Sequence, residues 1–157
     1  MTGVPEETDQ IDGNALTMVR VFDAPPERVF DAWTKPELLA EWWGPEWVRT
    51  PADSIRVAPE VGGEWSATMV GADGEEFPSD NVITLLERPS RIELVTAPGS
   101  PVRATLQVSL EVIGGRTVMT VVNRVLIGDA DLDAMAQGWQ SMLGRMRGAL
   151  TAAGAAR

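Results

Sequence analysis

The sequence contains no histidine, no cysteine and no tyrosine, and Lys35 is the only lysine among its 13 basic residues. These absences exclude a Ser–His–Asp triad, a Cys–His pair, disulfides and zinc sites with His or Cys ligands. Any proton transfer would fall to an Asp or Glu side chain, or to a water molecule that it orients. We therefore expect no catalytic residue, no metal and no cofactor, and we favour a binding protein over an enzyme.

The chain also lacks a basic surface and long apolar runs. Its net charge is −10 without any polybasic cluster, which argues against nucleic acid and against anionic membranes as partners. No run of about 18 apolar residues is present to span a membrane. Acidic residues follow Met1 where a signal peptide would be basic, so we expect a cytoplasmic protein.

A length of 157 residues with 44% hydrophobic residues fits one domain with a substantial core. Residues 1–13 are polar and acidic, and we predict a mobile tail there, followed by a single domain over residues 14–154. The apolar, β-favouring residues 15–22 predict a first strand. Proline at the first turn then predicts helices over 26–34 and from Pro36 to Trp43, ended by Gly44-Pro45.

The middle of the chain has the alternation of antiparallel strands joined by tight turns, such as Asp73-Gly74 and Gly114-Gly115. The predicted strands are 54–58, 64–70, 81–87, 91–96, 102–112 and 117–126. The strand Val82–Leu86 is apolar on both faces. A bulge, a crossing helix or a homodimer contact would each explain this pattern, and we favour the homodimer.

The last stretch, Asp129–Ala153, predicts a helix of about 25 residues, or about 37 Å. Apolar residues recur along it every three or four positions, and Asp129 would be its N-cap. Its apolar face is unusual in carrying three methionines and a tryptophan. Methionine fills irregular space and tolerates partners of varied shape. The face would then either complete a solid core or cover a cavity.

Four motifs occur in order along the chain: VFDAPPERVFDAWTKPELLAEWWGP at 21–45, VGGEW at 61–65, ERPSRIELV at 87–95 and GWQSMLGRM at 138–146. Together they resemble the activator-of-heat-shock-chaperone-ATPase homologue family of the START/SRPBCC superfamily. The resemblance implies an α+β helix-grip fold: a curved antiparallel sheet wraps around a long C-terminal helix, with two short helices after the first strand. It also implies a hydrophobic cavity between sheet and helix.

The residues expected to line that cavity are those that alternate toward the concave face or lie on the apolar side of the last helix. They are Trp65, Ala67, Met69, Leu106, Val108, Met119, Val121, Met135, Trp139, Met142 and Met146. Asn123 keeps step with Val121, so its amide should point inward and need a partner. Trp47 is the candidate gate. Of the adjacent Trp42 and Trp43, one should be in the core and the other nearer the cavity mouth.

Three functions fit these patterns. The favoured one is binding of a small hydrophobic molecule in the cavity. The second is a cyclase, dehydratase or hydrolase that uses a buried Asp or Glu and ordered water, with Glu64, Asp80 and Asn81 as weak candidates for polar site residues. The third, suggested by the name of the resembled family, is a co-chaperone that stimulates a heat-shock chaperone ATPase.

Overall fold

The computed structural model describes residues 3–155, so the first two residues of the predicted tail lie outside it. Within that range the chain forms nine strands and three α-helices. The strands are β1 (Thr8–Asp12), β2 (Ala15–Phe22), β3 (Val48–Arg49), β4 (Arg56–Val57), β5 (Glu64–Gly71), β6 (Glu76–Glu87), β7 (Arg91–Thr96), β8 (Arg103–Ile113) and β9 (Arg116–Ile127). The helices are α1 (Pro26–Thr34), α2 (Pro36–Trp42) and α3 (Leu132–Ala155).

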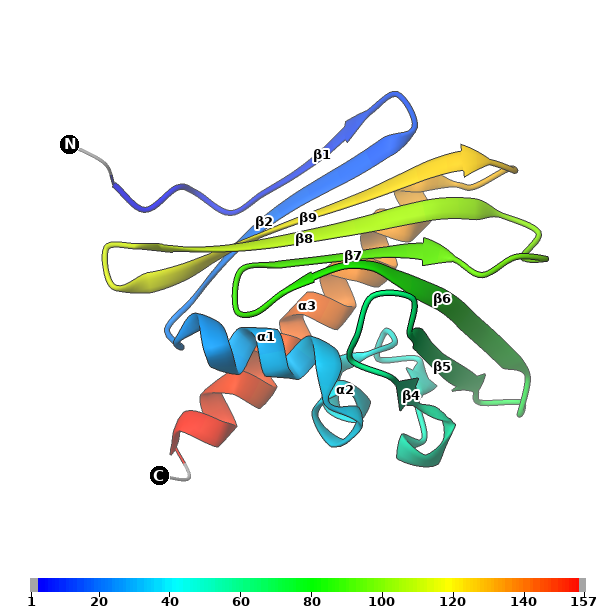
Figure 1. The fold of residues 1–157 in the computed structure, drawn as a ribbon, viewed down its shortest axis with the longest axis horizontal. Helices are drawn as coiled ribbons and strands as arrows, with labels where there is room; N and C mark the ends of the chain where they lie inside the picture. Colours follow the sequence, from blue (N-terminus) through cyan, green and yellow to red (C-terminus); the bar gives the residue numbers. More distant parts are fainter. Residues whose placement is uncertain (1–2, 156–157) are drawn as a thin grey trace.

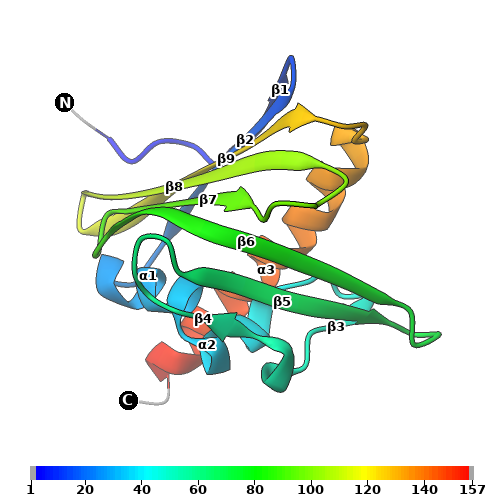
Figure 2. The same ribbon diagram turned by 45° about the vertical axis from the view of Figure 1, so that its right-hand side comes forward.

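All strands belong to one curved antiparallel sheet in the order β1-β2-β9-β8-β7-β6-β5-β3, with β4 also paired to β5. The three helices lie on one side of this sheet, and α3 crosses beneath its strands (Figures 1 and 2). Most residues that alternate toward the inner face are apolar and buried, so burial against the helices holds the layers together. The predicted helix-grip architecture is confirmed.

The helix starts follow the sequence signals closely. Proline occupies the first turn of both α1 and α2, where its missing N–H costs nothing. Helix α3 begins at Leu132, two residues later than an N-cap at Asp129 predicts. Its N-cap is Asp131 rather than Asp129, because Asp131 Oδ1 accepts a hydrogen bond from the backbone N–H of Ala134 at 3.1 Å.

The prediction of a mobile tail over residues 1–13 is wrong for Thr8–Asp12, which pairs along its whole length with β2. This segment has no apolar alternation, since all five residues are exposed. Backbone pairing and side-chain contacts hold it instead. Asp9 pairs with Arg20 at 2.7 Å and accepts a hydrogen bond from Gln140 of α3 at 2.9 Å, and Glu7 pairs with Arg147 of α3.

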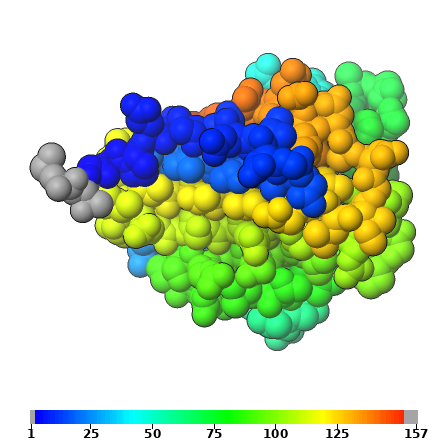
Figure 3. Space-filling view, turned by 90° about the horizontal axis from the view of Figure 1, so that it is seen from above, coloured from blue at the N-terminus to red at the C-terminus, as the bar shows by residue number. Residues whose placement is uncertain are grey.

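These contacts form an N-terminal clasp, defined by Glu7 and Asp9 with their partners. Figure 3 shows the N-terminal segment running along the edge of the sheet and bordering α3. Partial burial raises the pKa of the Glu7 carboxyl, but hydrogen bonds from Val21 N and Arg147 outweigh it, so the pKa lies below its ordinary value. For Asp9 as well, hydrogen bonds from Arg20 and Gln140 outweigh the effect of partial burial, so its pKa is lowered.

Strand β6 begins at Glu76, five residues before the predicted start. Pro78 obscured the strand in the sequence, since proline is rare inside sheets. It is accommodated because Asn81–Thr96 is the last pair between β6 and β7, so Pro78 has a strand neighbour only on the β5 side. By contrast, the predicted strand over 54–58 is shorter: a 3-10 turn occupies Ala52–Ser54, and β4 has two residues.

The strand Val82–Leu86 contains a bulge, because the register with β7 shifts between Ile83 and Leu85. Thr84 is exposed at the bulge. The next two residues, Leu85 and Leu86, lie on opposite faces of the strand and are both half-buried. A bulge was one of the three explanations for apolar residues on both faces. The homodimer stays a prediction.

Candidate functional site

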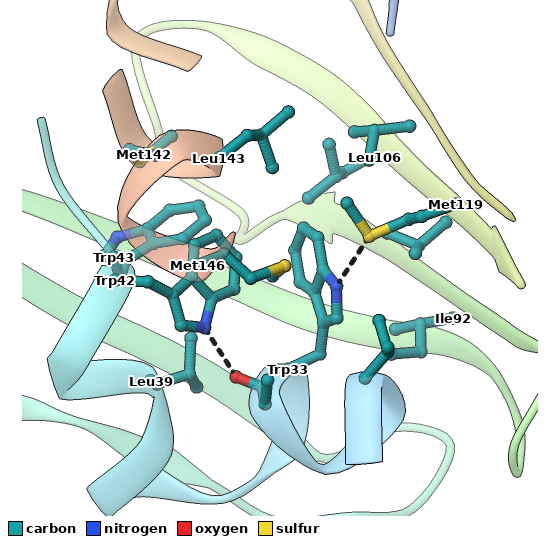
Figure 4. Packing of buried hydrophobic residues seen from close by; sticks show 14 of the residues in the cluster. Trp33, Leu39, Trp42, Trp43, Ile92, Leu106, Met119, Met142, Leu143 and Met146 are labelled. Carbon is teal, nitrogen blue, oxygen red and sulfur yellow. Dashed lines mark hydrogen bonds between the residues drawn. The ribbon is translucent and has the colours of Figure 1, made fainter. Parts of the chain in front are cut away.

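Tryptophan side chains fill the space between the sheet and the helices near α1. Trp33 is fully buried, and its Nε1 donates to Met119 Sδ at 3.4 Å. Trp42 donates to the carbonyl oxygen of Ala32 at 2.8 Å (Figure 4). Trp65 donates to the carbonyl oxygen of Trp33, also at 2.8 Å. Each of these three indole N–H groups has an acceptor, as buried polar groups require. We call this region the filled end.

The other end of the interface between sheet and α3 contains a cavity of about 190 Å³. Its apolar lining consists of Trp43, Leu94, Ala104, Leu106, Trp139 and Met142. Its polar lining consists of Ser79, Asn81, Thr96, Thr105 and Asn123. Strands β6 to β9 therefore supply one wall, and α3 with the residue after α2 supplies the other. We call this region the hollow end.

Trp43 is placed at the cavity by the turn that follows α2. Gly44 has φ +97°, and a Cβ there would lie 2.9 Å from Thr50 Oγ1, so only glycine fits this turn. Helix α3 holds the turn from the other side, because Arg145 donates to the carbonyl oxygen of Gly44 and Ser141 Oγ accepts from Glu46 N at 2.9 Å. The open question of the tryptophan pair is answered: Trp42 is in the core, and Trp43 lines the cavity.

Asn123 points inward, as the alternation of β9 predicts. With its amide oriented to satisfy both neighbours, Nδ2 donates to the carbonyl oxygen of Thr105 at 3.2 Å and Oδ1 accepts from Nε1 of Trp139 at 3.1 Å. The partners that a buried amide needs are thus a strand carbonyl and an indole of α3. This pair fixes the orientation of Trp139 over the cavity.

A second hollow of about 430 Å³ adjoins the cavity, and the two share Ser79, Asn81 and Thr96. Its remaining wall consists of Pro78, Asp80 and the connection between β7 and β8, residues 97–102. We call it the vestibule. The three shared residues lie on neighbouring strands, where Asn81 pairs directly with Thr96. They therefore form the boundary between the inner cavity and the outer space.

The predicted lining residues divide between three places. Leu106, Asn123, Trp139 and Met142 line the cavity. The others on the inner face are packed in the core without bordering it: Trp65, Ala67, Val108, Met119, Val121 and Met146 are buried, and Met135 is partly buried against them. Met69 and Trp47 line a separate groove at the protein surface. Trp47 is thus not beside the cavity, which removes the geometric basis for its predicted role as a gate.

Sequence reasoning missed Ser79, Leu94, Thr96, Ala104 and Thr105 of the cavity wall. Extending the alternation of β6 back from Asn81 would have placed Ser79 on the inner face. The pairings of β7 with β6 and of β8 with β9 would similarly have placed Thr96 and Ala104 near Asn81 and Asn123. The obstacle was register, which a single sequence does not supply.

The outer groove has a volume of about 590 Å³ and lies between the turn after α2 and the β5–β6 hairpin. Its apolar side chains are Pro45, Trp47, Val48, Met69 and Phe77. Trp47 is 59% exposed and Phe77 is 41% exposed. Two large aromatic side chains left in water beside a methionine are typical of a surface that contacts another molecule.

No carboxylate lines the cavity in the described part of the chain. Glu64 is exposed at the start of β5, and Asp80 is exposed beside the vestibule. Both acids that the enzyme hypothesis names are thus exposed rather than buried beside the cavity. Residues 3–155 also bring together no group of His, Cys, Asp or Glu suited to a metal ion, and none of their helices has the length and apolarity to cross a membrane.

Solved structures share this fold over nearly the whole chain. A protein from Nitrosomonas europaea is 22% identical with a TM-score of 0.81, covering 92% of this chain and 99% of that one. One from Chromobacterium violaceum is 23% identical with a TM-score of 0.79, covering 87% and 96%. The AHSA1 protein from Silicibacter pomeroyi is 23% identical with a TM-score of 0.74, covering 87% and 97%. At these identities the likeness establishes the fold alone.

No curated protein matches the sequence. The family described as "Activator of Hsp90 ATPase homolog 1-like protein" matches residues 23–151. That range contains α1, α2, most of the sheet and α3 to the end of its buried face. The chain therefore belongs to this family, within the START/SRPBCC superfamily.

Proposed function

We propose that this protein binds a small hydrophobic molecule in the cavity between the sheet and α3. The observation that carries the proposal is the hollow itself. A space of about 190 Å³ remains beneath Trp139 and Met142, beside a large cluster of buried apolar side chains. Protein interiors leave few voids larger than a water molecule, because each void forfeits contacts.

The size of the cavity limits the ligand. An apolar cavity of about 150 Å³ accommodates one benzene molecule, so a space of about 190 Å³ suits a single substituted ring. A sterol or a long acyl chain would need several times this volume, so most of it would lie in the vestibule or in solvent. Trp43, Trp139 and Met142 offer flat and polarizable surfaces to such a ring.

The test is a screen of single-ring compounds by thermal unfolding. A ligand present at 100 times its Kd stabilises the folded state by about 2.7 kcal/mol, which is a shift of several degrees for a domain of this size. The matched variant is Ala104→Leu, which places a larger side chain in the cavity and should abolish the shift. A broad set of compounds that shifts neither protein would contradict the proposal.

A second candidate function is stimulation of a heat-shock chaperone ATPase. It is favoured by the outer groove, whose exposed Trp47 and Phe77 are of the kind that a protein partner buries, and by the family description. Its test is the ATPase rate of a purified chaperone with and without this protein. Stimulation that is lost in Trp47→Ala and kept in Ala104→Leu would assign the activity to the groove. An unchanged ATPase rate would eliminate the candidate.

A further inference from the structure

The polar groups at the junction of cavity and vestibule are all uncharged. Asn81 uses its amide N–H groups internally, donating to the carbonyl oxygen of Trp65 at 3.3 Å and to Ser79 Oγ at 3.1 Å. Its Oδ1 accepts no hydrogen bond from the residues that the structure describes. An amide oxygen that borders two hollows is therefore available to a ligand.

Two hydroxyl groups beside it are also available. Ser79 Oγ accepts from Asn81, and Thr96 Oγ1 accepts from the backbone N–H of Ala104 at 3.1 Å. Neither hydroxyl donates to an acceptor in the described chain. Each hydroxyl has one hydrogen to give. The junction thus presents one acceptor and two donors, on residues that are half-buried.

Asp80 is the one charged residue among the described residues that line the cavity and the vestibule. No arginine or lysine borders the cavity or the vestibule among the described residues. The one acid, Asp80, is exposed and alternates to the face opposite Ser79 and Asn81. A ligand carboxylate or ammonium group would lose its water without gaining an ionic partner, which is costly. The net charge of −10 adds repulsion for anions.

We infer that the ligand is an uncharged single-ring molecule that carries a hydrogen-bonding substituent, such as a hydroxyl or a primary amide. The ring lies between Trp139 and Leu106, and the substituent reaches Asn81, Ser79 and Thr96 at the junction. This inference rests on the proposed function, since it names the class of molecule that the same cavity takes. Both substituents contain a donor for Asn81, and both contain an acceptor for the hydroxyl groups.

The experiment compares five probes of one ring size by isothermal titration and by NMR: toluene, benzyl alcohol, benzamide, benzoate and benzylamine. A net hydrogen bond of about 1 kcal/mol corresponds to a change in Kd of about fivefold. Benzyl alcohol and benzamide should therefore bind at least about fivefold more tightly than toluene. Benzoate and benzylamine, both charged at pH 7, should bind more weakly than toluene.

The variant Ser79→Ala removes one donor from the junction and adds no bulk. It should reduce the preference for benzamide over toluene by about fivefold while toluene affinity stays unchanged, which also shows that the cavity is intact. The matched control is Ser109→Ala, at an exposed position on the outer face of β8. It should change neither the affinity for benzamide nor that for toluene.

The outcomes separate the two claims. If toluene binds as tightly as the alcohol and the amide, or if benzoate binds as tightly as benzamide, the ligand class is wrong and the cavity proposal stands. If none of the five probes binds at millimolar concentration, the cavity proposal and the ligand class both fail.

Discussion

The two ends of one interface, between the same sheet and the same helix, differ in how completely they are packed. At the filled end, Trp33, Met119, Val121 and Met146 are each 0% exposed. At the hollow end, Leu106, Trp139 and Met142 are also nearly buried, yet they surround about 190 Å³ of space. The burial of their apolar side chains therefore does not distinguish the ends.

The two ends differ in whether side chains of α1 and α2 lie between the sheet and α3. Helices α1 and α2 lie beneath one part of the sheet, beside the C-terminal half of α3 (Figures 1 and 2). They insert Trp33 and Trp42 between sheet and α3 (Figure 4). At the hollow end only Trp43 reaches the gap, from the turn after α2. The cavity exists because the short helices end before they cover the whole concave face.

The largest expected effect is on the stability of the filled end. Trp33→Ala should lower the free energy of unfolding by about 3–5 kcal/mol, because it removes a fully buried ring from a tightly packed site. Denaturant unfolding measures this loss. A loss below about 1 kcal/mol would mean that the filled end is not rigidly packed, and the contrast between the two ends would disappear.

A matched pair of alanines on the inner face separates the two ends directly. Ala67 is 1% exposed and lines none of the hollows described above, whereas Ala104 lines the cavity. Ala67→Leu should destabilise the protein by about 1–3 kcal/mol through overpacking. Ala104→Leu should be near neutral, because the cavity receives the added atoms. Equal losses of unfolding free energy in the two variants, by the same denaturant measurement, would contradict a cavity beside Ala104.

Asn123 links the sheet to α3 at the hollow end. Asn123→Leu should cost about 1–3 kcal/mol, since it leaves Nε1 of Trp139 and the carbonyl oxygen of Thr105 without their partner. Indole NMR of Trp139 would show the lost hydrogen bond. The control Gln107→Leu, at an exposed position of β8, should change stability by less than about 0.5 kcal/mol. A neutral Asn123→Leu would show that the pair does not orient Trp139.

The N-terminal clasp should give the smallest effect. The pKa values of Glu7 and Asp9 are lowered on folding, so their stabilisation is present above the ordinary carboxyl pKa of about 4. It is lost as the pH falls through the lowered folded-state values. Glu7→Gln should reduce stability at pH 7 by less than about 1 kcal/mol, because the pair is well exposed. It should also flatten the loss of stability below pH 4. An unchanged acid profile would refute this role.

Residue patterns predicted most of the architecture. Proline at helix starts, Gly44-Pro45 at a helix end and the alternation of 102–112 placed α1, α2 and β8 within one or two residues. Two segments were missed because backbone pairing, rather than apolar burial, defines them. Thr8–Asp12 has no buried side chain, and Pro78 interrupts the strand signal of β6.

The candidate site was predicted only in part for a related reason. Periodicity identifies the inner face, so Leu106, Asn123, Trp139 and Met142 were found. Periodicity does not say how far along that face the side chains of α1 and α2 extend. Val121 and Met119 have the same alternation as Asn123 but are packed in the core, where Met119 accepts from Trp33. Only the positions of α1 and α2 decide which of these residues border a space.

The most direct test of a hollow confined to one end is NMR of protein labelled with ¹³C at the methionine methyl groups, titrated with benzyl alcohol. Met142 borders the cavity, whereas Met119 is packed at the filled end, where its sulfur accepts from Trp33. A bound ring should shift the methyl resonance of Met142 strongly and leave that of Met119 almost unchanged. A shift at Met119 that equals or exceeds the shift at Met142, or no shift at saturating ligand, would contradict a cavity beneath Trp139.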